Sequence, residues 1–90
     1  MRVALICIDK PDALQVRLDN RAAHLAHIDA SGVVELAGPF LDQQGRMTGS
    51  LIVLNVEGMA EAEAWAAADP YAIAGLFETV TIREWRKVVG

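Results

Sequence analysis

The sequence of 90 residues has room for one small domain and no more. It is 53% hydrophobic and 22% charged, which excludes the composition typical of disordered chains. With 8 basic against 12 acidic residues, the net charge of -4 has the wrong sign for a protein that neutralises many phosphates. We therefore expect a folded single domain over residues 1–90 that binds no nucleic acid.

Cys7 is the only cysteine, so neither an internal disulfide nor a cysteine cluster for zinc can form. His24 and His27 lie three positions apart, but without cysteine ligands they are a poor basis for a metal site. The apolar run after Met1 is too short for a secretion signal, and no run reaches membrane-spanning length. We expect a cytoplasmic protein that needs no metal or cofactor and binds no membrane.

The first half of the chain predicts a strand, a helix and a hairpin. Residues 2–8 are almost wholly apolar and end at a polar turn, which is typical of a buried strand. A helix is predicted over 11–31, between a proline favoured at helix starts and a glycine favoured just after helix ends. Two further strands are predicted at 33–40 and 48–56, on either side of a polar turn.

The second half predicts a helix, a short helical turn and a strand. Residues 59–68 are rich in alanine and glutamate, which favour a helix. Asp69 and Pro70 then suit the N-cap and first position of a short turn through Ala74. Residues 77–88 are rich in Thr, Val, Ile and Trp and predict a fourth strand. The order indicates an α+β, ferredoxin-like βαββαβ fold with an antiparallel four-stranded sheet.

Two of the predicted strands are apolar on both faces, although the helices of such a fold cover only one face of the sheet. In the first strand, Val3, Leu5 and Cys7 alternate with Ala4, Ile6 and Ile8, and in the third, Leu51 and Val53 alternate with Ile52, Leu54 and Val56. Large exposed apolar patches are uncommon on monomers, and a second copy is the simplest cover. We predict a homodimer that packs sheet against sheet.

The first predicted helix carries polar residues beside an apolar stripe. The stripe, which we expect to be buried, consists of Leu14, Leu18, Leu25 and Ile28. Arg17, Arg21 and His24 flank it on one side, whereas His27 is expected to face solvent. These flanking residues have two interpretations: a cleft reaches them, or they are a boundary row whose stems cover apolar surface while their heads stay in water.

Other polar and aromatic residues have ordinary structural explanations. Asp69 suits an N-cap, and Ser50 suits a hydroxyl at the edge of a strand. Trp65 and Trp85 are expected in the core and in the dimer interface, while the role of Tyr71 is open.

Several short motifs, in this order and spacing, resemble the YCII-related (YciI-like) family. They are Arg21-Ala22-Ala23-His24-Leu25, Ala37-Gly38-Pro39, Gly49-Ser50-Leu51 and Ala68-Asp69-Pro70-Tyr71. The resemblance implies a ferredoxin-like fold that dimerises as in the dimeric α/β barrel superfamily. It also implies a site around a His-Asp pair, which maps onto His24 and Asp69. Some relatives are similar to enzymes that eliminate hydrogen chloride from chlorinated aromatics, and the superfamily includes lactone isomerases.

Such a pair suits proton abstraction at neutral pH, because the unperturbed pKa of histidine is about 6.5. The leading hypothesis is a small-molecule lyase or isomerase in which His24 is the base and Asp69 orients it. Arg21, Arg17, Ser50 and Tyr71 are the candidate substrate-binding residues, and the ligand is expected to be anionic. The alternative hypothesis is a non-catalytic dimer that binds a small acidic metabolite or a protein partner. In that case His24 and Asp69 would lie apart or be sealed from any cavity.

Overall fold

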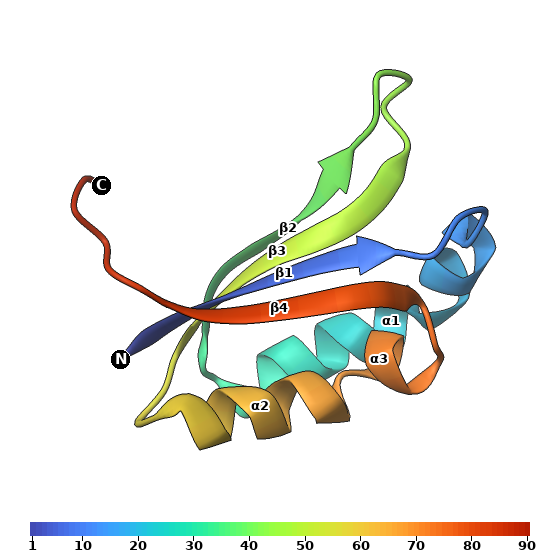
Figure 1. The fold of residues 1–90 in the computed structure, drawn as a ribbon. Helices are drawn as coiled ribbons and strands as arrows, with labels where there is room; N and C mark the ends of the chain where they lie inside the picture. Colours follow the sequence, from blue (N-terminus) through green and yellow to red (C-terminus); the bar gives the residue numbers. More distant parts are fainter.

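The computed structural model describes residues 1–90 and confirms the predicted order of elements. These elements are β1 (Arg2–Asp9), α1 (Leu14–Ser31), β2 (Val34–Leu41), β3 (Met47–Asn55), α2 (Met59–Ala68), α3 (Pro70–Ile73) and β4 (Phe77–Trp85). The strands form one antiparallel sheet in the order β2-β3-β1-β4 (Figure 1). The protein therefore has the ferredoxin-like fold.

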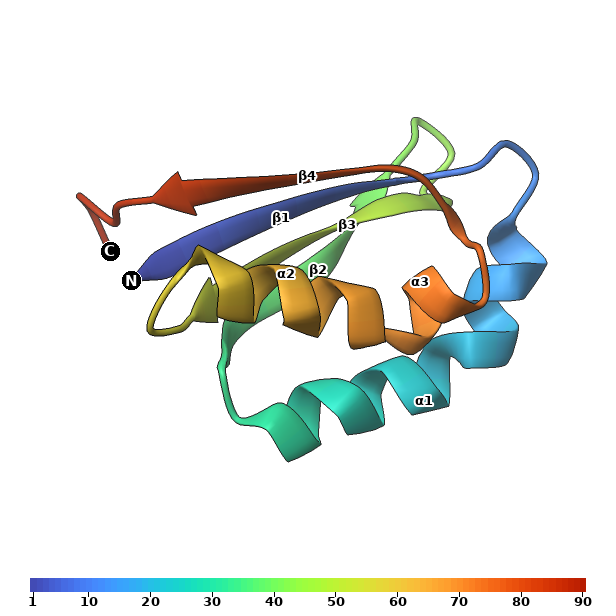
Figure 2. The same cartoon turned by 60° about the horizontal axis from the view of Figure 1, so that its bottom comes forward.

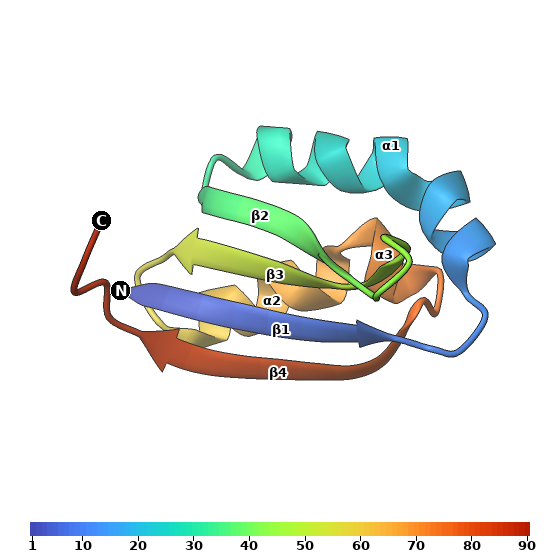
Figure 3. The ribbon, with the colours of Figure 1, turned by 90° about the horizontal axis from the view of Figure 1, so that it is seen from above.

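The helices all lie on one face of the sheet. Figure 2 shows α1, α2 and α3 together beneath the strands, and Figure 3 looks onto the face that no helix covers. Because antiparallel partners place their side chains on the same face, β1 and β3 project one apolar row toward the helices and one away from them.

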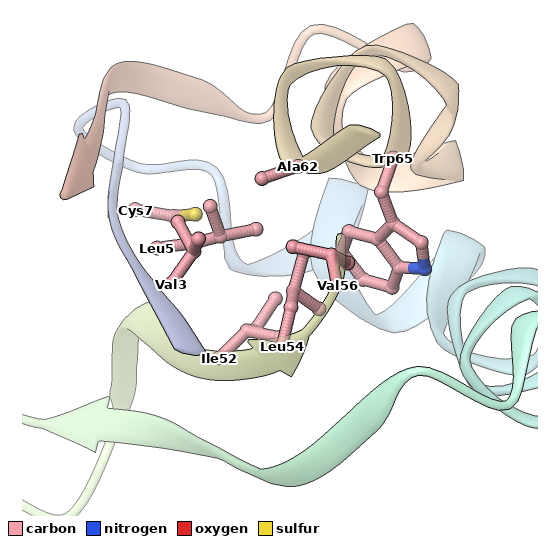
Figure 4. Packing of buried hydrophobic residues seen from close by; sticks show 8 residues of the cluster. All are labelled: Val3, Leu5, Cys7, Ile52, Leu54, Val56, Ala62 and Trp65. Atoms are coloured by element: carbon pink, nitrogen blue, oxygen red, sulfur yellow. The ribbon is translucent and has the colours of Figure 1, made fainter. Parts of the chain in front are cut away.

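The core lies between the two central strands and α2 (Figure 4). Alternate residues of β1 and β3 supply most of it, and α2 closes it from the other side. Its buried members are Val3, Leu5, Cys7, Ile52, Leu54, Val56, Ala62 and Trp65. Trp65 also donates from Nε1 to Ser31 Oγ over 2.9 Å, which ties α2 to the end of α1.

Two element boundaries lie three residues from their predicted positions, for local reasons. Helix α1 begins at Leu14 instead of residue 11, because Asp12 has a φ of 57°, a left-handed conformation that an α-helix does not contain. Strand β4 ends at Trp85 instead of residue 88. Trp85 pairs with Arg2, the first residue of β1, so no neighbouring strand remains for the residues that follow.

The expected buried stripe of α1 is confirmed only in part, since Ile28 packs against the core but two of its leucines do not. Leu18 and Leu25 are 47% and 43% exposed, whereas Arg17 and His24, which were expected at the edge of the buried stripe, are 3% and 6% exposed. The helix turns its polar flank inward because that flank finds charged and hydrogen-bonding partners there. His27 does not face solvent either, since Nε2 lies 3.2 Å from the Trp65 carbonyl oxygen and its ring packs against that indole.

The uncovered face of the sheet is apolar over β1 and β3 and mixed over β4, where Thr79, Thr81 and Arg83 share it with Trp85. By the alternation of the strands, Ile6, Ile8, Leu51, Val53, Leu36, Phe40 and Trp85 belong to it. Ile8, Leu36 and Trp85 are each more than 40% exposed. None of the helices is long and apolar enough to cross a lipid bilayer.

Candidate active site

All the buried polar residues of the protein gather in one place between α1, β3 and α3. They are Arg17, His24, Ser50 and Asp69, and the buried ring of Tyr71 lies among them. Burying polar side chains is costly unless they are hydrogen-bonded, and no buried side-chain nitrogen or oxygen here lacks a partner. Each buried polar atom of this network therefore has at least one hydrogen-bond partner inside the protein.

His24 and Asp69 form a hydrogen-bonded pair. His24 Nδ1 lies 2.8 Å from Asp69 Oδ1, and the same oxygen accepts the Tyr71 backbone N–H over 3.0 Å. Asp69 is thus the N-cap of α3, as its sequence position predicts, and also the partner of His24. A carboxylate accepts hydrogen bonds, so Nδ1 carries the proton, and Nε2 of a neutral imidazole is left with a free lone pair.

The Tyr71 ring contacts both basic side chains of the network. Its ring stacks on the His24 imidazole with centroids 3.9 Å apart and an interplanar angle of 14°. The Arg17 guanidinium carbon lies 4.8 Å from the centroid of the same ring. Burial raises the pKa of the Tyr71 phenol, and the nearby Arg17 charge only partly opposes this. Tyr71 is therefore a neutral phenol near neutral pH.

Arg17 is held by a residue that the sequence did not single out. Asp9, the last residue of β1, accepts from Arg17 Nε over 2.9 Å and from Nη2 over 2.8 Å, with both side chains almost fully buried. Burial lowers the pKa of Arg17, but the hydrogen bonds and charge of Asp9 raise it further, so the guanidinium stays charged. Asp9 reads as an ordinary turn residue in the sequence. The only sequence feature that points to its pairing with Arg17 is a carboxylate eight positions before that residue.

The Arg17 guanidinium also reaches β3. Nη2 donates to Ser50 Oγ over 2.9 Å, and Ser50 is itself buried. Ser50 points to the helix side of the sheet because it pairs with Cys7, whose side chain belongs to the core. It is therefore part of the network instead of the simple strand-edge hydroxyl that its position predicts.

A cavity of about 160 Å³ opens onto this network. Its polar lining consists of Arg17, Arg21, His24, Ser50 and Tyr71, and its apolar lining includes Leu25, Ile28, Pro39, Met47 and Ile52. Arg21 is exposed and forms no salt bridge within the protein, so its charge is available to a ligand. A wider hollow of about 330 Å³ beside the β1–α1 turn contains neither His24 nor Asp69.

The structure also bears on metal binding and on the single cysteine. No group of three or more His, Cys, Asp or Glu side chains is placed to hold a metal ion. Burial raises the pKa of the Cys7 thiol to about 12, so it is not a thiolate nucleophile at neutral pH.

Comparison with known proteins places the chain in a family. Residues 1–86 match the model of the YCII-related domain. Protein YciI of Escherichia coli O6:H1 is 38% identical over 89 residues, covering 89% of this chain and 91% of YciI. An uncharacterized protein of Haemophilus influenzae is 32% identical, covering 98% of this chain and 99% of its own length.

A solved structure is also similar over nearly the whole chain. It is the 5-chloro-2-hydroxyhydroquinone dehydrochlorinase TftG of Burkholderia phenoliruptrix AC1100, in complex with 2,5-dihydroxybenzoquinone. The TM-score is 0.87 and the identity 33%, with 96% of this chain and 94% of TftG covered. The extent of these matches shows that the chain belongs to the YCII-related family.

Proposed function

We propose that this protein is a small-molecule lyase or isomerase in which His24 abstracts a proton from the substrate. The observation that carries the proposal is the pairing of His24 Nδ1 with buried Asp69 at the wall of a cavity. Asp69 fixes the tautomer and stabilises the imidazolium that forms when Nε2 takes a proton. A base of this kind contributes about 10²- to 10⁴-fold in rate.

The proposed reaction needs no oxidant and no covalent intermediate. His24 removes a proton from a carbon next to a carbonyl, or from a ring hydroxyl, and the electron pair moves into the substrate as an enolate. In an elimination from a chlorinated phenol, the ring first takes its keto form, in which the carbon that bears chlorine gains a proton and becomes tetrahedral. Proton removal by His24 then lets the enolate electron pair form the new ring double bond as the C–Cl bond breaks, so that hydrogen chloride is lost in total. In an isomerisation the proton returns to another carbon. TftG, with its 33% identity, is a dehydrochlorinase, which supports the elimination.

The cavity favours a small anionic substrate with several oxygens. The charge of Arg17 is already balanced by Asp9, so exposed Arg21 is the cation left to anchor a carboxylate or phenolate. A volume of about 160 Å³ holds one six-membered ring, since a cavity of about 150 Å³ binds benzene. The bound 2,5-dihydroxybenzoquinone in TftG is a ligand of this size and chemistry.

A non-catalytic binding module is the weaker alternative. It requires His24 and Asp69 to be apart or sealed from any cavity, whereas they lie 2.8 Å apart and His24 lines one.

Homodimerisation through the apolar sheet face also remains our proposal, and it serves either function. A cytoplasmic location is proposed on the unpaired Cys7 thiol, which suits a reducing compartment.

The test is dehydrochlorination of 5-chloro-2-hydroxyhydroquinone by the parent protein and by His24→Ala and Asp69→Asn. Each variant should lose at least about 10²-fold in kcat. His27→Ala is the matched control, because this second histidine of α1 lies outside the cavity and should leave kcat unchanged. If both variants turn the substrate over as fast as the parent, or the parent does not turn it over at all, the proposed function is wrong.

A further inference from the structure

The Ser50 hydroxyl has one polar contact inside the protein. It accepts a hydrogen bond from Arg17 Nη2 over 2.9 Å, and no protein atom accepts the Ser50 hydroxyl proton. A serine hydroxyl has one proton to donate in addition to its lone pairs. Because Ser50 is buried and lines the 160 Å³ cavity, the place for that proton to find an acceptor is the cavity itself.

The guanidinium makes this donor stronger. Hydrogen bonds in a chain polarise one another, and a hydroxyl that accepts from a cation donates more strongly. Asp9 holds two of the Arg17 nitrogens, Nε and Nη2, so the guanidinium cannot turn away from Ser50. The chain Asp9–Arg17–Ser50 therefore aims one activated donor into the cavity whose wall also carries His24.

We infer that Ser50 is a catalytic residue that binds the developing enolate oxygen of the substrate, and that Asp9 is a positioning residue acting through Arg17. The inference rests on the proposed function, because proton removal by His24 is what creates the negative oxygen. Substrate anchoring then falls to Arg21, and Arg17 serves oxyanion stabilisation. The ligand class is an oxygen acid whose conjugate base is an enolate or phenolate.

Ligand binding tests the donor without relying on turnover. The probe is 2,5-dihydroxybenzoquinone, an acidic enol, titrated into the protein and followed by calorimetry. Ser50→Ala should weaken its binding about 10- to 100-fold, the usual range for a hydrogen bond to a charged group. Asp9→Asn should weaken it as well, and the double variant should lose less than the product of the two losses, since both act through one chain.

Two further variants separate this role from general stability. Glu35→Gln is the matched control, since both Glu35 oxygens accept from the Nε of another arginine, Arg2, away from the cavity, and this variant should leave binding unchanged. Asp9→Asn leaves the buried Arg17 guanidinium without its counter-charge and can unfold the protein. The double variant Asp9→Leu with Arg17→Met avoids this problem because it removes both charges at once. That protein should fold, as shown by its melting curve, yet bind the probe as weakly as Ser50→Ala.

Turnover separates this inference from the proposed function. Ser50→Ala should lower kcat about 10²- to 10³-fold, the usual loss for one oxyanion donor, and change KM much less. A parent that does not bind the probe, or a Ser50→Ala protein that binds it within twofold of the parent, overturns the inference. If turnover is lost in His24→Ala but not in Ser50→Ala, only the inference about Ser50 is overturned. If Ser50→Ala binds the probe more weakly while His24→Ala keeps full turnover, only the role of His24 as the base is overturned.

Discussion

A single oxygen of Asp69 has two structural roles. Oδ1 caps α3 through the Tyr71 N–H and accepts from His24 Nδ1. The two roles need different chemistry, because any small acceptor can cap a helix, whereas stabilising an imidazolium needs a negative charge. A single substitution can therefore separate stability from activity.

Asp69→Ser and Asp69→Ala make this separation measurable. Serine keeps a capping oxygen, so the free energy of unfolding of the serine variant should exceed that of the alanine variant by about 1 kcal/mol. Both variants should lose the proposed activity equally, since neither has a carboxylate for His24. Urea unfolding and kcat measure the two quantities. Equal stability of the two variants, or retained activity in the serine variant alone, would contradict this division of roles.

Cys7 predicts a loss of stability at alkaline pH. Burial raises the pKa of its thiol from 9.0 to about 12. A raised pKa means that the folded state holds the proton more tightly, so this contribution is fully present below pH 9.0 and declines as the pH rises toward 12. The melting temperature of the parent should fall more steeply above pH 9 than that of Cys7→Ala. Parallel melting profiles for the two proteins would refute the prediction.

At the scale of elements, β2 and β3 differ in how closely their glycines are packed. A methyl group on Gly49 would clash with the Cys7 carbonyl oxygen and press on the Phe40 ring, whereas one on Gly38 would meet nothing within 4 Å. Neither glycine has a positive φ, so only the available space distinguishes them. Gly49 is therefore required by the close approach of β1.

Gly49→Ala should destabilise the protein by about 1–3 kcal/mol, the usual cost of overpacking a well-packed site. Gly38→Ala is the matched control, and it should leave the free energy of unfolding within about 0.5 kcal/mol of the parent. Chemical denaturation of the three proteins gives both values. A Gly49→Ala protein as stable as Gly38→Ala would show that β1 and β3 can separate without cost.

In helix α1, the hydrogen-bonding partners of the polar side chains override the apolar periodicity of the sequence. Its leucines predict one buried stripe, yet Leu18 and Leu25 are exposed because Arg17 and His24 occupy the inward side. Their partners, Asp9 and Asp69, come from β1 and from the N-cap of α3. A buried ion pair and a His-Asp pair fix the rotation of the helix, since breaking either would strand a charged or polar group away from water.

At the scale of the whole molecule, the apolar sheet face predicts self-association. Ile8, Leu36 and Trp85 remain exposed on the side that no helix covers, as Figure 3 shows for the strands. Exposed apolar side chains gathered on one face mark an interaction surface in soluble proteins. We expect that a second copy buries it about a two-fold axis.

Ile8→Glu should therefore yield a monomer of 9.7 kDa, whereas the parent should be a dimer of twice that mass. Ile73→Glu makes the same chemical change on α3, at a side chain that is 73% exposed and off the sheet, and should stay dimeric. Light scattering after size-exclusion chromatography distinguishes the two masses. A monomeric parent at micromolar concentration would rule out the sheet-to-sheet dimer.

The sequence alone determined the element order and the ferredoxin-like fold, because strand alternation, helix stops and caps are interactions between near neighbours. It also indicated His24 and Asp69 through family resemblance. Only the tertiary structure decided that Asp9 holds Arg17, that Ser50 joins them and that α1 buries its polar flank. His24 and Asp69 are 45 positions apart, and Arg17 and Ser50 are 33 apart. No local pattern encodes such contacts, which exist only once the sheet and α3 set the side chains facing one another.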